Sequence, residues 1–369
     1  MLRFGIIGTN VISDAFVGAC QATDGRARAV GVHSRRQATA DAFAARHGLD
    51  TATDDLDALF EAVDAVYIAS PVGAHHAQAL AAIAAGRHVL VEKTMGADAG
   101  QVVAIVEAAE DAGVIALEAV RNVHTPMHRL IRDTLPELGE LRYARLEKLQ
   151  YSSRYDAFRG GEVLNAFDPS LGNSALADIG VYCLQPALDL LGAPRNVGGA
   201  SVFLANGFEA GGSMYLDHGS LVVDLAWSKI AAGLGPSVIT GEDASLSLDD
   251  SADVTRIVLH PRKGEPQVLW EGPPGPPMAT MHYEINDFCH LVDAGAMDQR
   301  WSALSVNARA IMDAHLAASA AAWCSSPTSP PSTPTTKPPY SKPSTPSSPR
   351  PNSEHSPAEP AEVKPFERP

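Results

Sequence analysis

The sequence predicts an α/β protein in which a parallel sheet is followed by an α+β domain with a largely antiparallel, open sheet. Within the first 120 residues, short β-branched runs alternate with Ala-rich helical stretches, a pattern typical of parallel sheets covered by helices on both faces. Beyond Arg121, strand-like runs follow one another directly and are separated by Gly and Asp, which indicates antiparallel pairing. The chain of 369 residues is too long for one ordinary core, so two folded domains are expected.

The first domain, residues 1–120, has the strand and helix alternation of a Rossmann-type fold. Continuous apolar runs indicate buried parallel strands, and the Ala-rich stretches between them indicate the covering helices. The predicted strands cover residues 3–8, 27–34, 65–70, 87–93 and 114–120, and helical patterns cover residues 36–48 and 75–86. Because such sheets bind ligands at the carboxyl ends of their strands, we expect an NAD(P)-binding domain.

The second domain, residues 121–324, is expected to bind the substrate and to mediate oligomerisation. It starts with a helix near Pro126, and a polar loop through Pro169 separates its first strand from a helix over residues 173–192. The predicted strands cover residues 141–153, 201–206, 212–217, 220–228, 236–241, 244–250, 254–261 and 266–270, and closing helices cover Tyr283–Ala294 and Ala303–Trp323. An open sheet of this kind predicts a homo-oligomer, a dimer or a tetramer.

The last segment, residues 325–369, differs from the rest in composition. It contains 14 of the 27 prolines, many Ser and Thr residues, and almost no large apolar side chains. Such a segment buries too little surface to offset its ordering entropy. We expect a disordered tail without a catalytic role, with a Pro-rich docking ligand as the alternative.

Composition and charge limit the classes of partner and the compartment. The formal net charge is −15, which disfavours nucleic acid and anionic membranes as partners. No apolar run reaches the roughly 20 residues that a membrane span needs, and no signal-peptide pattern is evident. The four cysteines show no paired spacing, which favours reduced thiols in a cytoplasmic protein.

The turn after the first strand, "GIIGTNVIS", is a modified dinucleotide fingerprint. Its three glycine positions hold Gly8, Asn10 and Ser13. Asn tolerates positive φ better than most residues, so the turn remains feasible and a pyrophosphate is expected at the following helix N-terminus. The predicted cofactor-binding residues here are Gly8, Thr9, Asn10, Val11 and Ile12. An ordinary strand–helix turn is the alternative.

The second strand indicates which dinucleotide is bound. It ends in "VHSRR", so Ser34 stands where an acidic residue would bind a ribose 2′-hydroxyl, and Arg35 follows. A hydroxyl beside a guanidinium suits a 2′-phosphate. NADP(H) is therefore favoured and NAD(H) remains possible, while two solvated surface arginines are the alternative reading.

A lysine follows the strand "RHVLVEK". Glu92 and Lys93 lie at its carboxyl end, where a lysine can polarise a substrate carbonyl, and partial burial is expected to lower its pKa. The alternative is a strand-end lysine that is paired with Glu92.

Several segments in this order resemble the glucose–fructose oxidoreductase, inositol dehydrogenase and rhizopine-catabolism family (Gfo/Idh/MocA). They are "GIIGTNVIS", "SRR", "AVYIASPVGAHHAQALAAIAAGRHVLVEKT" and "GNSALADIGVYCLQPALDLLG", and the likeness covers about residues 2–323. On the cofactor side, the resemblance implies that Ser70 and Pro71 form a turn beside the nicotinamide. It also matches His75 to the family's usual histidine one turn later.

On the catalytic side, the resemblance matches Glu92–Lys93 to the family's Glu-Lys-Pro element, whose lysine is catalytic. Asp178 and Tyr182 match the helix that faces this lysine, with Tyr182 as the acid/base. Their i, i+4 spacing places both side chains on one helix face, and Lys93 is expected to help the phenol ionise. A half-buried core tyrosine is the alternative. The family proline is replaced by Thr94, which puts the usual bend in doubt.

The substrate contacts are predicted from the polar loop alone. Arg154 and Asn165 carry groups that can bond sugar hydroxyls, although solvated loop residues are an equal alternative. His124 and His128 have a helical metal spacing, but Pro126 lies between them and no third ligand is nearby, so no metal is expected.

The sequence thus predicts an NADP(H)-dependent oxidoreductase that transfers a hydride between nicotinamide and a carbinol or carbonyl carbon of a sugar, polyol or dihydrodiol. A non-catalytic NAD(P)-binding regulator or scaffold is the alternative, and Asn10 and Thr94 mildly favour it.

Overall fold

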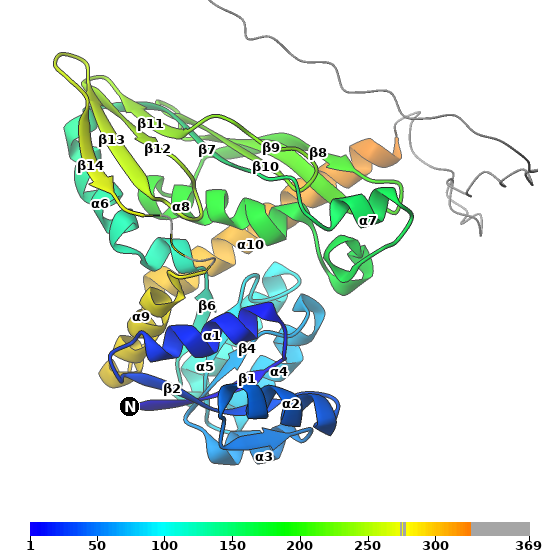
Figure 1. Cartoon of the computed structure of the whole chain (residues 1–369). Coiled ribbons are helices and arrows are strands. Elements are labelled where there is room, and N and C mark those ends of the chain that lie inside the picture. Colours follow the sequence, from blue (N-terminus) through cyan, green and yellow to red (C-terminus); the bar gives the residue numbers. More distant parts are fainter. Residues whose placement is uncertain (274, 276–277, 326–369) are drawn as a thin grey trace, which may run out of the picture. The chain divides into compact units, whose positions relative to one another are not determined.

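The computed structural model describes residues 1–273, 275 and 278–325 (Figure 1). Apart from Ser325, the tail that is predicted to be disordered lies outside these residues. No helix in the described ranges combines the length and the apolarity that crossing a bilayer requires.

The first sheet has six parallel strands in the order β3-β2-β1-β4-β5-β6, which is the Rossmann order. The strands are β1 Leu2–Ile7, β2 Ala27–His33, β3 Thr51–Thr53, β4 Ala65–Ile68, β5 His88–Glu92 and β6 Ala116–Ala119. The helices between them are α1 Val11–Gln21, α2 Gln37–His47, α3 Leu56–Ala62, α4 Val72–Ala84 and α5 Ala99–Ala112. The strand order reverses between β1 and β4, so their carboxyl ends open a crevice.

The second sheet has eight strands in the order β14-β13-β12-β11-β7-β10-β9-β8. Its strands β7 and β10 are parallel, whereas the other neighbouring pairs are antiparallel. The strands are β7 Leu141–Leu149, β8 Asn196–Phe203, β9 Glu209–Asp217, β10 Val222–Ser228, β11 Ser237–Gly241, β12 Ala244–Leu248, β13 Arg256–Pro261 and β14 Gln267–Glu271. The predicted fold class is confirmed.

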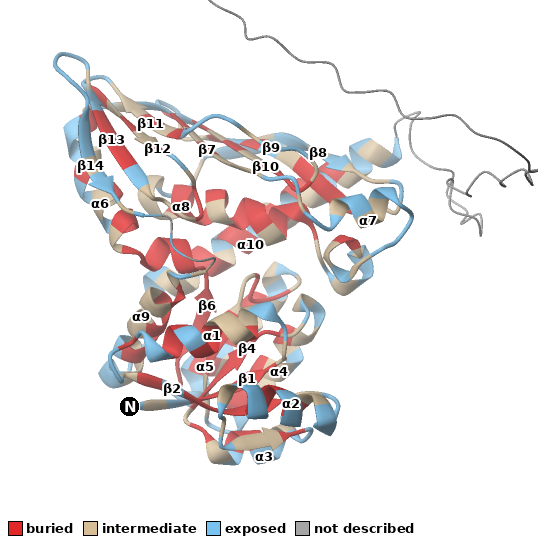
Figure 2. Ribbon diagram, in the orientation of Figure 1, coloured by how far each residue is buried: buried red, intermediate tan, exposed pale blue. Residues whose placement is uncertain are grey.

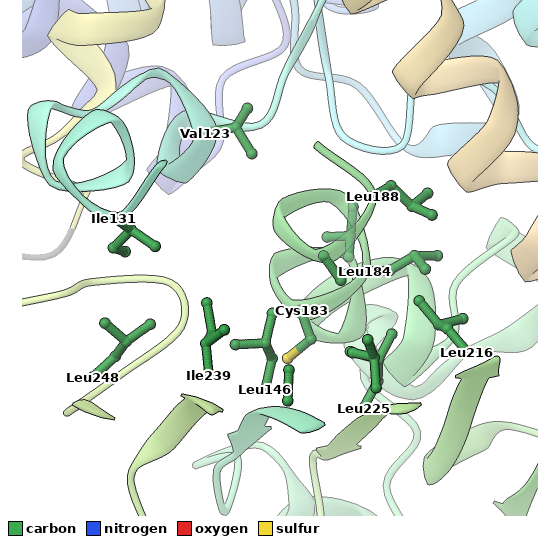
Figure 3. Packing of buried hydrophobic residues seen from close by; sticks show 14 of the residues in the cluster. Val123, Ile131, Leu146, Cys183, Leu184, Leu188, Leu216, Leu225, Ile239 and Leu248 are labelled. Atoms are coloured by element: carbon green, nitrogen blue, oxygen red, sulfur yellow. The ribbon is translucent and has the colours of Figure 1, made fainter. Parts of the chain in front are cut away.

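Helices cover one face of this second sheet (Figure 1). They are α6 Pro126–Thr134, α8 Val181–Leu191 and α10 Gln299–Cys324. Side chains alternate along the strands, so that Val223, Leu225 and Trp227 of β10 are buried while Val222 is exposed. Figure 3 shows Leu225 and its neighbours packing toward Leu184 of α8, and Figure 2 shows the buried residues concentrated between the sheet and its helices.

The polar loop between β7 and the α8 region contains short helical segments that the sequence analysis did not predict. They are α7 Tyr155–Arg159 and the 3₁₀ turns Asn165–Phe167 and Pro169–Leu171. A π-helical turn, Leu176–Gly180, lies within the stretch 173–192 that is predicted as one helix. Two further 3₁₀ turns, Arg121–His124 and Leu135–Leu138, flank α6.

The two closing helices bind the sheets together. Helix α9, Met281–Ala294, packs Met281, Ile285 and Phe288 into the core of the first sheet, where the rings of Phe288 and Phe4 are 5.6 Å apart. Helix α10 contacts both sheets, because Asp313 accepts a bond from the Ala99 amide while His315 bonds Ser201 of β8. Although the sequence assigns α9 to the second domain, its apolar stripe completes the first core.

Candidate functional site

A cavity of about 600 Å³ lies at the carboxyl ends of β1, β2 and β4. Its lining brings together most of the predicted cofactor residues from three separate loops. Residues lining it include Gly8, Thr9, Asn10, Ser34, Arg35, Ser70 and Pro71, together with His33, Gln78, Asn165, Ser170 and Leu171. We call this cavity the nucleotide groove.

The turn that begins the groove requires Gly8 but not a second glycine. Gly8 has a φ of +116°, and a Cβ there would lie 2.9 Å from the carbonyl oxygen of Ala69. The expectation that Asn10 takes up positive φ is wrong, because its φ is −92°. Instead its Oδ1 accepts a bond from the Ser13 amide, and its Nδ2 donates to the Ala69 carbonyl. Asn10 therefore caps α1 and ties it to β4.

Two predicted residues of this turn do not line the groove. Val11 is largely exposed and Ile12 packs against the core of the first sheet. Their contribution is their position in the first turn of α1, whose amide groups have no partners within the helix. A helix N-terminus of this kind attracts an anionic group.

At the far end of the groove, Ser34 and Arg35 follow β2. Among the residues that the structure describes, no carboxylate lines this end, and the buried His33 lies beside Ser34 and Arg35. The sequence analysis overlooked His33 because it precedes the polar run. A serine hydroxyl and a guanidinium at the strand end suit a phosphate better than a free ribose hydroxyl.

The turn after β4 connects the groove with the lysine. Ser70 donates to Gln78, while the buried His75 places Nε2 2.7 Å from the Ser70 carbonyl and Nδ1 2.9 Å from the Thr94 carbonyl. His75 thus lies behind the groove rather than in it. It holds the groove wall beside the Lys93–Thr94 segment.

Glu92 also lies outside the groove. Tyr67 donates to its Oε1 at 2.5 Å, and burial raises the pKa of the Glu92 carboxyl. The alternative in which Glu92 pairs with the Lys93 amine is therefore not observed. The Lys93 amine instead points toward the second domain.

Lys93 and Asp178 are brought together across the two halves. Lys93 Nζ donates to Asp178 Oδ1 at 2.7 Å and to the Asp178 carbonyl at 2.5 Å. The Lys93–Thr94 peptide bond is cis. Burial alone would lower the pKa of Lys93, but the charge and hydrogen bond of Asp178, together with the nearby Tyr182 and Glu92, outweigh burial and raise it. The expectation of a lowered lysine pKa is therefore wrong, and Lys93 stays protonated.

The helix that carries Asp178 is not a continuous α-helix. Leu176–Gly180 form a π-helical turn, and α8 begins at Val181. Such turns occur often at functional sites. Here the turn presents both the carboxylate and the backbone carbonyl of Asp178 to the same amine, whereas a regular i, i+4 face does not explain the carbonyl contact.

The Tyr182 ring lies between two cations. Lys93 Nζ is 5.4 Å and the Arg121 guanidinium carbon is 5.1 Å from the ring centroid. Burial raises the pKa of Tyr182, while both cations act in the opposite direction. Lys93 therefore acts on the phenol in the expected direction, but the net direction is upward because burial outweighs the two cations.

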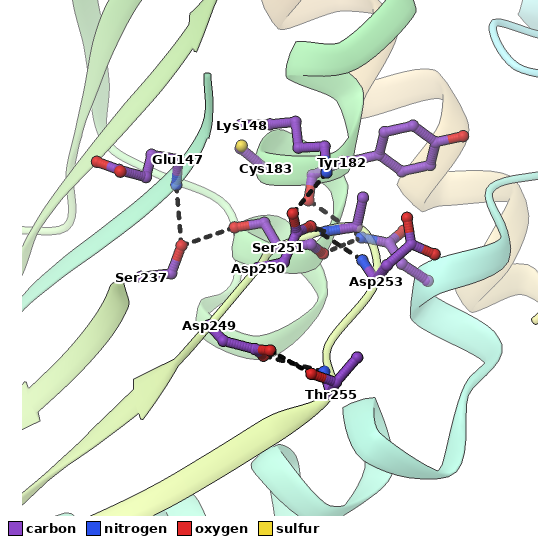
Figure 4. A network of polar contacts seen from close by, with 12 residues as sticks. Glu147, Lys148, Tyr182, Cys183, Ser237, Asp249, Asp250, Ser251, Asp253 and Thr255 are labelled. Carbon is purple, nitrogen blue, oxygen red and sulfur yellow. Dashed lines mark hydrogen bonds and ion pairs between the residues drawn. The ribbon is translucent and has the colours of Figure 1, made fainter. Parts of the chain in front are cut away.

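Arg121 was missed by the sequence analysis. Its side chain is buried, and it bonds both carboxylate oxygens of Asp253, the Ala252 carbonyl and Thr280 Oγ1. Asp253 belongs to the β12–β13 loop, residues 249–255, which Figure 4 shows beside Tyr182. Asn122 donates to the carbonyls of Tyr182 and Ser251. The loop therefore fixes the start of α8, and no local sequence pattern could reveal it.

The structure separates the two predicted substrate residues. Asn165 lines the nucleotide groove, whereas Arg154 is exposed at the start of α7 and does not line it. His124 and His128 face different carboxylates, Asp287 and Asp189. Among the described residues, no cluster of three or more potential metal ligands occurs.

Lys229 is a further residue that was not predicted from the sequence. It follows β10, is almost fully buried, and its Nζ lies 2.8 Å from Asp178 Oδ2. Asp178 therefore bridges two lysines, and together they hold the pKa of its carboxyl below the ordinary range although burial acts against them. The signal was available, because Lys229 follows the carboxyl end of a strand just as Lys93 does.

The residues around the groove fit a phosphorylated dinucleotide. A helix N-terminus, a glycine-only turn and a Ser–Arg pair lie along one cavity. The inner wall of the groove adjoins Lys93 through His75. This order matches a pyrophosphate at the turn, a 2′-phosphate at β2 and a nicotinamide beside the lysine.

Comparison with known proteins agrees with this geometry. Residues 2–119 match the family model described as "Oxidoreductase family, NAD-binding Rossmann fold". The scyllo-inositol 2-dehydrogenase (NADP(+)) IolU of Bacillus subtilis is 36% identical over 301 residues, which cover 81% of this chain and 90% of that protein. The uncharacterized oxidoreductase YgjR of Escherichia coli is 34% identical over 307 residues, with 83% and 92% covered.

Among solved structures, the chain is similar to KijD10, a 3-ketoreductase from Actinomadura kijaniata crystallised with NADP and TDP-benzene. The TM-score is 0.74 at 25% sequence identity, and the likeness covers 85% of this chain and 96% of that one.

Proposed function

Because the chain belongs to the Gfo/Idh/MocA oxidoreductase family, we propose that it is an NADP(H)-dependent dehydrogenase or reductase acting on CH–OH groups. It interconverts a carbinol and a carbonyl carbon of a sugar, polyol or dihydrodiol. When bound, the cofactor supplies or accepts the hydride at C4 of its nicotinamide. The remaining chemistry belongs to side chains of this chain.

The observation that carries the proposal is the meeting of Lys93 and Tyr182 beside the groove. The amine comes from β5 and the phenol from α8, and 5.4 Å separates Nζ from the ring centroid. A protonated Lys93 donates to the substrate oxygen and stabilises negative charge there. Tyr182 exchanges the hydroxyl proton, and Asp178 orients the lysine.

NADP(H) is favoured over NAD(H) by Ser34 and Arg35 in the groove. The relatives support this choice, because the Bacillus subtilis protein is named as an NADP(+) enzyme and the 3-ketoreductase was crystallised with NADP. The substrate class is supported by the inositol substrate in the first name.

The two departures that favoured a non-catalytic regulator have structural explanations. Asn10 caps α1, and Thr94 is buried, where its hydroxyl donates to the Gly96 carbonyl and accepts a bond from Arg309. Neither favours loss of activity.

A homo-oligomer is supported by the second sheet, because no described helix covers its outer face (Figure 1). Exposed aromatic and β-branched side chains lie on this face at Tyr143, Val202, Tyr215, Val222 and Val268. Apolar faces of this kind mark interaction surfaces. Light scattering on Tyr215→Glu would test this, and an unchanged mass would contradict it.

A cytoplasmic location is supported by the free cysteines, of which Cys20, Cys183 and Cys289 are buried, since such thiols persist in reducing compartments. The net charge of −15 supports small molecules rather than nucleic acid as partners.

The activity is tested by fluorescence titration with NADPH and NADH, followed by a panel of sugars, inositols and dihydrodiols monitored by absorbance. Lys93→Ala should abolish turnover and spare NADPH binding, whereas Lys263→Ala, an exposed lysine between β13 and β14, should leave both unchanged. Turnover that survives Lys93→Ala contradicts the roles. Tight NADPH binding without turnover across the panel favours the regulator.

A further inference from the structure

A loop of the second half borders the nucleotide groove. Asn165, Ser170 and Leu171 line the groove opposite Ser70 and Pro71. A Cβ on Gly73 would lie 3.9 Å from the Leu171 carbonyl oxygen, so the loop and the β4–α4 turn are in van der Waals range. We call residues 165–172 the strap.

The strap is held from the second sheet by a few specific bonds. Asn206 donates to the Phe167 carbonyl at 2.9 Å, and Lys229 donates to the Ala166 carbonyl at 2.8 Å. Phe167 is fully buried against Phe208. These contacts fix one end of the strap, while Ser170 and Leu171 reach the groove.

The Lys229 ammonium contacts both the π-helical turn, at Asp178, and the strap, at Ala166. Its Nζ lies 2.8 Å from Asp178 Oδ2 and 2.8 Å from the Ala166 carbonyl, and it lies 4.9 Å from the centroid of the Phe167 ring. Its side chain is 4% exposed, and a buried ammonium is costly unless it is paired. Opening the strap would remove the Ala166 carbonyl and the Phe167 ring from Lys229, and would leave it with Asp178 and the Phe208 ring, whose centroid is 5.4 Å away.

We propose that Lys229 is a positioning residue that couples closure of the strap over the bound dinucleotide to the orientation of Asp178. The inference rests on the proposed function, because it takes the groove to hold NADP(H). Coupling of this kind is reciprocal, so a dinucleotide that holds the strap closed also stabilises the Lys229–Asp178 pair. Asp178 in turn holds Lys93.

The test compares three variants of the full chain. Lys229→Met removes the shared ammonium, and Asn206→Ala loosens the strap without touching Asp178. Lys148→Met is the matched control, because Lys148 is a half-buried lysine of the same sheet that pairs with Asp250 at 2.6 Å. NADPH dissociation is measured by stopped-flow displacement, and kcat is measured against pH.

We expect Lys229→Met to accelerate NADPH dissociation about 10-fold, since a charge-assisted bond is lost. We also expect the acid limb of the kcat–pH profile of Lys229→Met to move to higher pH. Asp178 then keeps only Lys93 as a neighbouring cation, so the pKa of its carboxyl is lowered less. Asn206→Ala should accelerate dissociation without moving this limb, and Lys148→Met should leave the dissociation rate unchanged. If Lys229→Met does not fold, Lys229→Gln should show the same movement of the limb.

Three outcomes overturn the proposal. In the first, Lys229→Met releases NADPH at the Lys148→Met rate. In the second, its acid limb coincides with that of the unmodified enzyme. In both, NADPH binding and turnover by the unmodified chain leave the proposed function standing. In the third, the unmodified chain does not bind NADPH, and both proposals fail together.

Discussion

Replacing Asp178 by Asn removes the negative charge between two lysines while keeping the shape of the side chain. Lys93 Nζ lies 2.7 Å from Oδ1 and Lys229 Nζ lies 2.8 Å from Oδ2. An amide accepts with one oxygen only and turns an N–H donor toward the other ammonium. One lysine therefore loses an acceptor, and both lose their counter-charge.

The expected loss in the free energy of unfolding depends on how deeply the three side chains are buried. The side chains of Lys93 and Lys229 are 13% and 4% exposed, whereas Asp178 is 43% exposed. Breaking a buried pair costs about 3–5 kcal/mol and an exposed pair about 0–1 kcal/mol. Because the carboxyl is partly exposed and each lysine keeps a backbone acceptor, we expect a loss of about 2 kcal/mol in the free energy of unfolding, between these limits.

The direction of the pKa shift of Asp178 determines how its contribution to stability changes with pH. Burial would raise the pKa of Asp178, but Lys93 and Lys229 hold it below its ordinary range. The carboxylate therefore contributes stability that is fully present above the unfolded pKa of about 4 and is lost as the pH falls toward the folded pKa. The difference between Asp178→Asn and the unmodified protein should be constant from pH 8 to pH 5 and should narrow below about pH 4.

Thermal unfolding followed by circular dichroism at several pH values measures this difference. At neutral pH we expect Tm to fall by about 3 °C, because the entropy of unfolding grows with chain length. The Asp250→Asn variant provides the comparison, because Asp250 pairs with one lysine rather than two. The Tm of this variant should fall less than that of Asp178→Asn. An unchanged Tm at pH 7, or a difference that persists undiminished at pH 3, would refute the two-lysine reasoning.

Three further predictions concern single side chains. Tyr182→Phe should lower kcat by about 10²–10⁴-fold. NADPH affinity and Tm should stay nearly unchanged, because the ring keeps its contacts with both cations. If more than a tenth of the activity remains, Tyr182 is not the acid/base. Arg35→Ala should weaken NADPH binding about 10-fold and NADH binding only slightly. The control Arg36→Ala, a residue outside the groove lining, should change the binding of neither cofactor. Equal losses for both cofactors in Arg35→Ala would argue against a 2′-phosphate contact. Arg121→Met should lower the free energy of unfolding by about 2 kcal/mol in urea titration, because Asp253 loses its partner but is itself partly exposed. A loss below about 1 kcal/mol would show that the loop is held by its other bonds.

Local pattern was enough for the first sheet and for part of the site. The five apolar runs that predicted strands became β1, β2, β4, β5 and β6, because a strand buried on both faces must be apolar throughout. The short β3 gave no pattern, since three residues of Thr and Ala carry no periodicity. Gly8 was identifiable because only glycine tolerates its φ and the close Ala69 carbonyl.

The resemblance supplied Lys93, Asp178 and Tyr182, but their electrostatics needed the fold. A pKa depends on burial and on charges that are distant in the sequence. The pKa of Lys93 is raised by Asp178, which lies 85 residues away, together with Tyr182 and Glu92, and the pKa of Tyr182 is raised by burial. Asn10 also changed its role, because its side chain found the Ser13 amide and the Ala69 carbonyl.

By itself, the sequence determined the order of the elements, the glycine turn and the side chains that can transfer a proton, because these are recorded in short stretches of chain. Only the tertiary structure decided that Arg121 and Lys229 join them and that the strap borders the groove. These contacts link residues from 51 to 132 positions apart. They arise from the packing of two sheets through α9 and α10, a property of the whole chain that no local pattern encodes.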